Sequence, residues 1–151
     1  MKLAEALQER ADLNRRLEQL RSRLSRNATV QEGEQPAEDP NALLTELDEC
    51  IARFEYLVNA INRTNAAVCV GDKTLTALIA RKDALTQQLA IYRAFLEEAS
   101  SLASRYSRTE IKILSTVDVR GLQKKVDGMA KELRLTDNAL QQANWTVDLI
   151  E

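Results

Sequence analysis

Apolar residues recur every three to four positions along four long stretches of this chain, and this periodicity limits the folds open to it. An α-helix has about 3.6 residues per turn, so such spacing places the apolar side chains on one helical face. A period of two residues, typical of a strand, occurs once. The predicted helices span residues 2–26, 40–70, 74–104 and 118–150, and the predicted strand spans residues 110–117. We therefore expect a mainly α fold: an elongated bundle of four long helices with a small two-stranded β-ribbon, in a single domain of residues 1–151.

Local signals at the ends of these stretches support the predicted boundaries. Asp39 precedes Pro40, and this pair is typical of a helix start, because Asp accepts amide hydrogen bonds and Pro suits the first turn. Gly71 is a natural end for the second helix, and either Asp72 or Thr74 can cap the third. The short connection between these helices predicts an antiparallel hairpin.

The predicted strand needs a partner, because an isolated strand leaves its backbone groups unpaired. We expect it to pair with residues 29–31, a short segment rich in β-branched side chains. The pairing forms either within one subunit or between two, and the sequence leaves both arrangements open. Asp118 follows the strand and can cap the fourth helix.

The chain has no histidine, and this absence weighs against most enzyme mechanisms. Histidine is a frequent general base and a frequent zinc ligand. Two separated cysteines form no C-x-x-C site, and four glycines form no phosphate-binding loop. We therefore predict a protein that is not an enzyme and needs no metal or cofactor. A carboxylate-dependent Mg²⁺ enzyme is the remaining enzymatic alternative.

The charge pattern gives little support for a polyanionic partner. The net charge is −2, and residues 27–49 carry seven acidic side chains and no basic ones. Arginines gather near the end of the first helix, but acidic residues lie among them, so we predict no nucleic-acid binding. Neither a signal peptide nor a membrane-spanning segment is recognisable, which predicts a cytoplasmic protein with Cys50 and Cys69 as free thiols.

The length of the helices points to self-association. At about 1.5 Å per residue, the second, third and fourth helices are each about 45 Å long. Slender bundles bury little surface alone, so we expect a homo-oligomer formed through the first helix or the hairpin faces. Arg10 occupies a position in the first apolar stripe, where it either sets the register or extends along the edge of the seam.

Polar residues also fall on or beside the other apolar stripes, and they form the predicted binding site. Its members are Asn62, Arg63, Asn65, Lys82, Asn144 and Trp145. One interpretation is a polar layer that fixes the helix register. The other is a pocket between helices or subunits, in which amides and cations bind a small anionic or nucleotide-like ligand beside the indole ring.

Several segments together resemble the septicolysin-like family of small bacterial proteins. They are Val30–Glu34, Pro36, Glu38–Pro40, Ile61–Asn65, Arg81–Asp83, Tyr106–Lys112 and Asn144-Trp145. The resemblance implies a pore-forming, cytolytic toxin, whose amphipathic helices would have to rearrange to enter a membrane. This is the alternative to the function predicted from the residues: a non-enzymatic, homo-oligomeric helical protein that binds a ligand or a protein partner at its helix or subunit interfaces.

Overall fold

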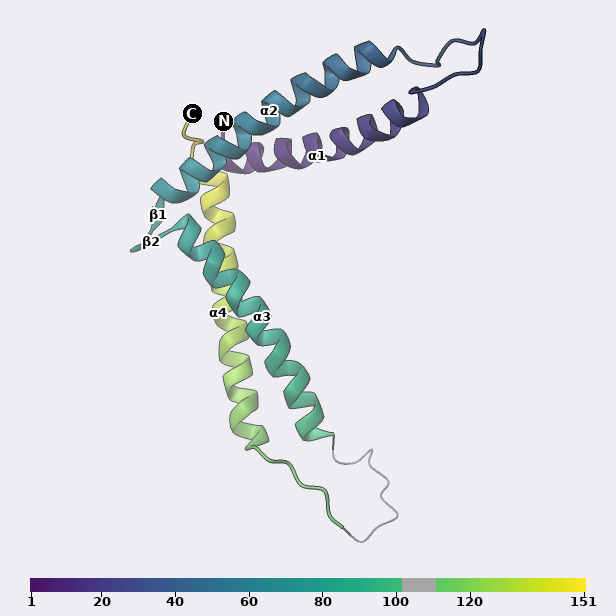
Figure 1. The fold of residues 1–151 in the computed structure, drawn as a ribbon. Coiled ribbons are helices and arrows are strands. Elements are labelled where there is room, and N and C mark those ends of the chain that lie inside the picture. The colour runs from purple at the N-terminus through teal and green to yellow at the C-terminus, as the bar shows by residue number, and fades with distance from the viewer. Residues whose placement is uncertain (102–110) are drawn as a thin grey trace. The chain divides into compact units, whose positions relative to one another are not determined.

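The computed structural model describes residues 1–101 and 111–151 and confirms the mainly α fold. Figure 1 shows the order of the elements, which include a short two-stranded antiparallel sheet. The elements are α1 (Leu3–Arg26), α2 (Pro40–Ala67), β1 (Cys69–Val70), β2 (Lys73–Thr74), α3 (Leu75–Ser100) and α4 (Val119–Thr146).

The helices begin where the sequence places their caps. The Asp39 side chain accepts a hydrogen bond from the backbone N–H of Asn41 at 3.0 Å, and Pro40 is the first residue of α2. Thr74 Oγ1 accepts from the N–H at the start of α3, and Asp118 Oδ1 accepts from the N–H at the start of α4. Each cap satisfies an amide that has no partner inside its helix, so these boundaries follow from local chemistry.

The described chain divides into two compact units, each built on one pair of helices. The first unit contains residues 1–68 and 143–151, and the second contains residues 69–142. The single domain of the prediction therefore corresponds to two units, which we describe one at a time.

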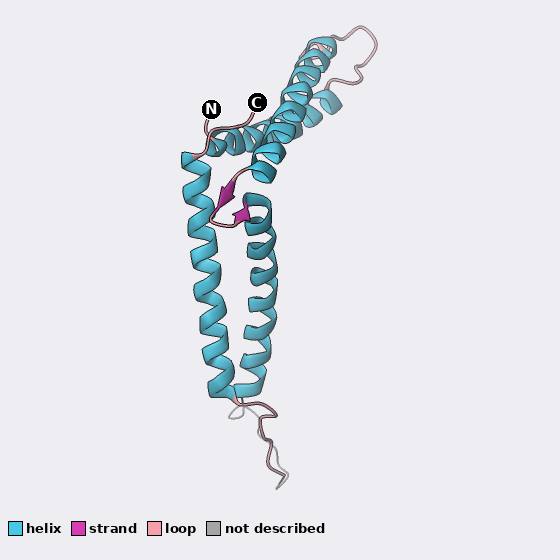
Figure 2. Ribbon diagram, turned by 90° about the vertical axis from the view of Figure 1, so that its left-hand side faces the viewer, coloured by secondary structure: helices cyan, strands magenta, loops and turns pink. Residues whose placement is uncertain are grey.

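In the first unit, α1 packs against α2 in antiparallel orientation (Figures 1 and 2). Leu20 of α1 and Leu43 and Cys50 of α2 form its buried cluster. Four half-buried leucines surround this cluster, namely Leu13, Leu17, Leu24 and Leu47. Full burial of a leucine such as Leu20 contributes about 1.5–3 kcal/mol, and the half-buried leucines contribute less each, so the leucine spacing is what holds the pair together.

In the second unit, α3 packs against α4, and the sheet precedes α3 (Figure 2). The buried cluster comprises Leu89 and Leu96 of α3 with Val126 and Met129 of α4. β1 and β2 connect α2 to α3; because these helices belong to different units, their antiparallel packing stays a prediction.

Both predicted strands are wrong in position where the structure describes them. Residues 29–31 and 111–117 are not in strands, and residue 110 lies outside the described residues. The sheet pairs Cys69 with Thr74 and Val70 with Lys73 instead. Gly71 explains the change: its φ of 65° suits a two-residue hairpin turn, so the second helix ends at Ala67 and the next residues pair locally.

The helix ends also differ from the prediction. Helix α4 ends at Thr146, and the last residues leave it to pair with the N-terminus inside the first unit. Leu3 N–H donates to Val147 O, and Leu149 N–H donates to Met1 O. These long-range pairings compete with helix continuation and have no periodic signal in the sequence. Helix α3 ends at Ser100; residues 102–104 of its predicted range lie outside the described residues.

Candidate functional site

Helix α2 carries a buried column with a repeat of seven residues. Leu43, Cys50, Leu57 and Thr64 are all buried. Seven residues make nearly two helical turns, so residues with this spacing stay on one side of the helix. This column marks the side of α2 that faces the interior of the first unit.

Beside this buried column, Glu46 and Arg53 of α2 form ion pairs with α1. We call this side of the helix pair the paired flank. Arg16 Nη2 lies 2.6 Å from Glu46 Oε1, and Arg53 Nε lies 2.6 Å from Glu9 Oε1. The Arg53 hydrogen bonds lower the pKa of the Glu9 carboxyl below its ordinary value. These pairs fix the register of α1 against α2.

The column on the other side of the buried one is apolar, exposed at Leu44 and Ile51 and half-buried at Val58, and we call this side the open flank. On α2 it comprises Leu44, Ile51 and Val58, again seven residues apart, and Asn65 continues it. Leu44 and Ile51 are each 46% exposed. Apolar side chains at regular helical spacing that no other helix covers are typical of a surface that docks another helix.

A groove runs along the open flank between α1 and α2. Its volume is about 460 Å³, and its floor is apolar. The lining residues are Asn14, Leu17, Glu18, Arg21 and Leu24 of α1 with Leu47 and Ile51 of α2. Leu47 and Ile51 belong to the apolar stripe of the second predicted helix, and α1 leaves one side of them uncovered.

The structure separates the predicted polar residues of α2 by their exposure. Asn62 and Arg63 are exposed, and Asn65 is half-buried on the open flank. The buried polar residue is Thr64, which the prediction missed. Its hydroxyl donates to Ala60 O at 2.8 Å and accepts from the N–H of residue 150 at 2.9 Å. The seven-residue repeat is the sequence signal that identifies it.

The predicted residues of α4 also differ in exposure. Asn144 is half-buried, and Trp145 is 64% exposed. In the part of the chain that the structure describes, no hydrogen bond joins the side chains of these two residues to one another or to Asn62, Arg63 or Asn65. A small-ligand site at these residues therefore stays a prediction.

Lys82 lies in the second unit, where it binds Asp137. Its Nζ is 2.7 Å from Asp137 Oδ1, and both side chains are partly exposed. The hydrogen bond from Lys82 holds the pKa of Asp137 below its ordinary value. The pair joins α3 to α4 between apolar layers, as expected for a polar position that fixes helix register.

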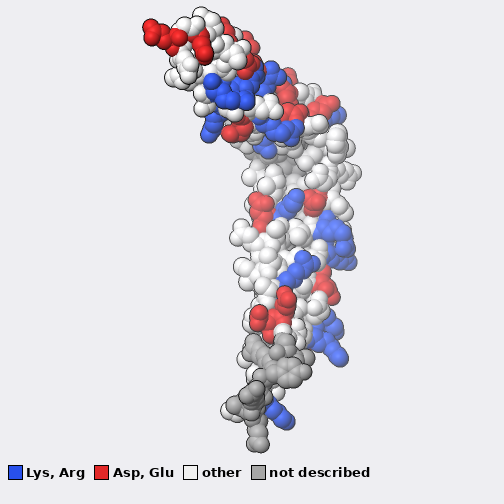
Figure 3. Space-filling model, turned by 90° about the vertical axis from the view of Figure 1, so that its right-hand side faces the viewer, with Lys and Arg blue, Asp and Glu red and all other residues white. Residues whose placement is uncertain are grey.

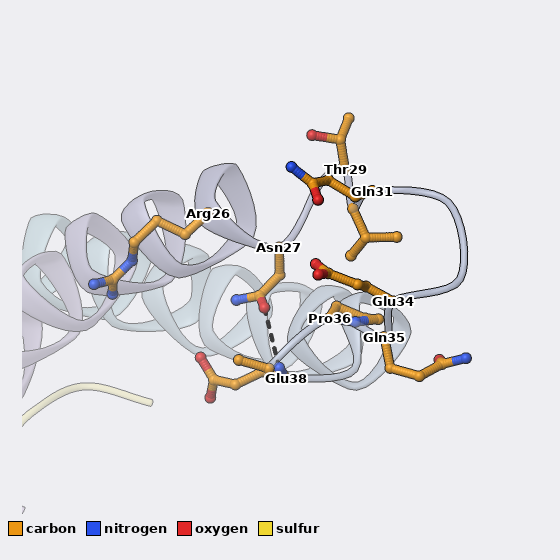
Figure 4. Close-up of a pocket in the computed structure, with 10 residues that line it drawn as sticks. Arg26, Asn27, Thr29, Gln31, Glu34, Gln35, Pro36 and Glu38 are labelled. Carbon is orange, nitrogen blue, oxygen red and sulfur yellow. Dashed lines mark hydrogen bonds between the residues drawn. The ribbon is translucent and has the colours of Figure 1, made fainter.

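A polar pocket of about 740 Å³ lies inside the loop that connects α1 to α2 (Figure 4). Asn27 anchors this loop: its Oδ1 accepts from Glu38 N–H at 3.0 Å, and its Nδ2 donates to Arg23 O at 2.8 Å. Figure 3 shows acidic side chains at this end of the unit, with basic ones farther back along the helices. Because the Asn27 side chain bonds both the last turn of α1, at Arg23 O, and the loop, at Glu38 N–H, we assign its amide to shaping the turn.

Two further observations concern the described residues as a whole. No three side chains among their His, Cys, Asp and Glu residues are grouped so that they could hold a metal ion. None of the four helices, in the ranges that the structure describes, combines the length and apolar character of a membrane-crossing segment.

Comparison with known proteins gives a family and a close structure. A crystal structure of a functionally unknown conserved protein from Corynebacterium diphtheriae is 42% identical to this chain, with a TM-score of 0.87. The match covers 99% of each chain. Among curated proteins none matches, and the septicolysin-like resemblance stays a prediction. The model of a family of unknown function, DUF6847, matches residues 10–149, and the chain belongs to this family.

Proposed function

We propose that this protein is a non-enzymatic helical protein that functions as a homo-oligomer, with the open flank of α1 and α2 as the surface that docks a second copy. The observation that carries the proposal is the groove on this flank, which Ile51 lines, together with the 46% exposure of both Ile51 and Leu44. Burial of apolar surface contributes roughly 25 cal/mol per Å², so covering this flank favours association.

The limited core of the first unit supports a second copy as the occupant. Within the described residues of the first unit, α1 is the long helix that packs along α2. Two helices of this kind commonly become stable by pairing face to face with another two, which yields a four-helix arrangement with an apolar interior. Both helices of this unit contribute leucines to the groove, so a copy of the same surface provides the matching apolar face.

The test combines native mass spectrometry with analytical ultracentrifugation from about 1 to 100 μM, the range in which weak homodimers separate. We expect a dimer that dissociates on dilution. A monomer throughout this range contradicts the proposed function. Mass in excess of the polypeptide would identify a bound small molecule. Such a molecule is what the polar residues on the apolar stripes predict.

One substitution and its control assign the interface to the open flank. Ile51→Lys places an ammonium in the groove and is expected to weaken dimerisation at least tenfold, or about 1.4 kcal/mol. Ile91→Lys is the control, since Ile91 is a helical isoleucine in the second unit and is 68% exposed. If Ile91→Lys dissociates the dimer and Ile51→Lys does not, the interface lies on α3 and not on the open flank.

A further inference from the structure

The two edges of the open flank carry opposite charges. On α1, the edge follows residues 10, 14, 17, 18, 21 and 24, and its charged members are Arg10, Glu18 and Arg21. Two arginines and one glutamate give this edge a net positive charge. Glu18 lies 3.4 Å from Arg21 on the same helix. On α2, Asp48 and Glu55 lie outside the exposed column, and both are acidic.

The paired flank fixes the level of each residue along the helix pair. Residue 9 of α1 lies beside residue 53 of α2, and residue 16 lies beside residue 46. Because the helices are antiparallel, Arg10 then lies at a level between Asp48 and Glu55. The basic side chain of one edge and the acidic side chains of the other are therefore at matching heights on the same surface.

Two symmetric arrangements bring two open flanks together. A two-fold axis perpendicular to the helices places α1 opposite α1 and α2 opposite α2, so like-charged edges meet. An axis parallel to the helices places α1 opposite α2 of the second copy. In the second arrangement, Arg10 faces Asp48 and Glu55 of the other copy twice, once at each edge.

From this charge complementarity, and resting on the proposed function, we infer that the partner is a second copy docked about a two-fold axis parallel to the helices. Each α1 then lies antiparallel to α2 of the other copy. The exposed Leu44 of one copy lies at the level of Leu17 of the other, and the aliphatic part of Arg10 covers Ile51. The result is an antiparallel four-helix arrangement with a basic–acidic contact along both edges.

One electrostatic effect opposes this arrangement, because it places both connecting loops at the same end. Each loop carries the exposed residues Glu32 and Glu34. Exposed charges farther apart than the Debye length, about 8 Å at physiological ionic strength, are largely screened. Charges in contact across the two edges are screened less, so the edge contacts dominate at physiological salt, and the loop repulsion strengthens as salt is removed.

Charge exchange across the edges tests this inference by sedimentation. In the Arg10→Glu homodimer, glutamate of each copy faces Asp48 and Glu55 of the other copy, so like charges meet at both edges. In the homodimer of the double variant Asp48→Arg with Glu55→Arg, two arginines of each copy face Arg10 of the other. We expect each homodimer to dissociate about tenfold more readily than the wild type. A mixture of the two variants restores opposite charges at both edges, and its heterodimer is expected to be as tight as the wild-type dimer.

The outcomes separate this inference from the proposed function. If wild-type protein is monomeric, both are wrong. If it is dimeric and Arg10→Glu forms a homodimer as tight as wild type, the copies meet in another arrangement and only the inference is wrong. Arg15→Glu is the matched control, because Arg15 lies on α1 away from the groove edge and binds Asp12 on the same helix. An equal loss in this control would mean that the net charge of α1, and not the edge contact, controls dimerisation.

Discussion

Thr64 joins the C-terminal segment to α2, and Thr64→Val tests that role. The side chain is buried, and its hydroxyl accepts the backbone N–H of Ile150 at 2.9 Å while donating to Ala60 O. Valine retains the β-branched shape and removes only the hydroxyl group. The Ala60 carbonyl keeps the helical hydrogen bond that it already accepts, so the amide of Ile150 is the group left without a partner.

The magnitude follows from the burial of that amide. An unpaired buried donor costs about 1–3 kcal/mol. Ile150 is half-buried, which allows water to replace part of the lost contact, so we expect about 1–2 kcal/mol of destabilisation. For a chain of about this length, each 1 kcal/mol lowers Tm by about 2–4 °C.

Urea unfolding gives the change in free energy, and hydrogen exchange by mass spectrometry gives its location. We expect faster exchange confined to the C-terminal peptide that contains Ile150. Thr45→Val is the matched control, because Thr45 makes the same kind of bond to Asn41 O, at 3.1 Å, from an exposed position on the same helix. Equal unfolding midpoints for the two variants, with unchanged exchange at the C-terminus, would refute the assigned role.

Four other substitutions test the packing, the electrostatics and the connecting loop. Leu57→Ala empties a fully buried site and is expected to cost about 2–5 kcal/mol in urea unfolding, whereas Leu44→Ala on the open flank is expected to cost less than about 1 kcal/mol in the monomer. Asp137 has a lowered pKa in the folded protein, so its contribution is complete above the ordinary aspartate pKa of about 3.9 and is lost as pH falls through the folded value. A Tm series from pH 7 to pH 2 should therefore fall less steeply for Asp137→Asn, and parallel curves would contradict the role of Lys82. Asn27→Ala removes both anchors of the connecting loop and is expected to speed amide exchange in residues 28–38; unchanged exchange there would show that the loop holds its shape without them.

Features with a local cause could be predicted from the sequence. Each of the caps at Asp39, Thr74 and Asp118 depends on a side chain and an amide two or three residues apart, so the local sequence determines it. The strand predicted at residues 110–117 is wrong over residues 111–117, the part that the structure describes, because alternation indicates a preference for strand and pairing requires a partner. The C-terminal segment also depends on a distant partner, since Lys2 pairs with Asp148.

The candidate site shows how a correct helix prediction can still assign the wrong face. The apolar stripe that the sequence predicts on α2 starts at Leu43 and advances by three or four residues to reach Asn65, close to the 3.6-residue period of a straight helix. The buried column starts at the same leucine but advances by seven residues to reach Thr64, a mean of 3.5 per turn. A seven-residue repeat drifts by about 20° per repeat around a straight helix, and after three repeats the two paths end one residue apart, at Thr64 and Asn65. Periodicity alone therefore identifies a broad apolar surface and cannot say which side of it α1 covers. The charges make that distinction, because Glu46 and Arg53 lie on one side and bind α1, whereas Leu44 and Ile51 lie on the other and remain exposed. An apolar stripe wider than one neighbouring helix can cover is thus the sequence signal for a second partner on α2.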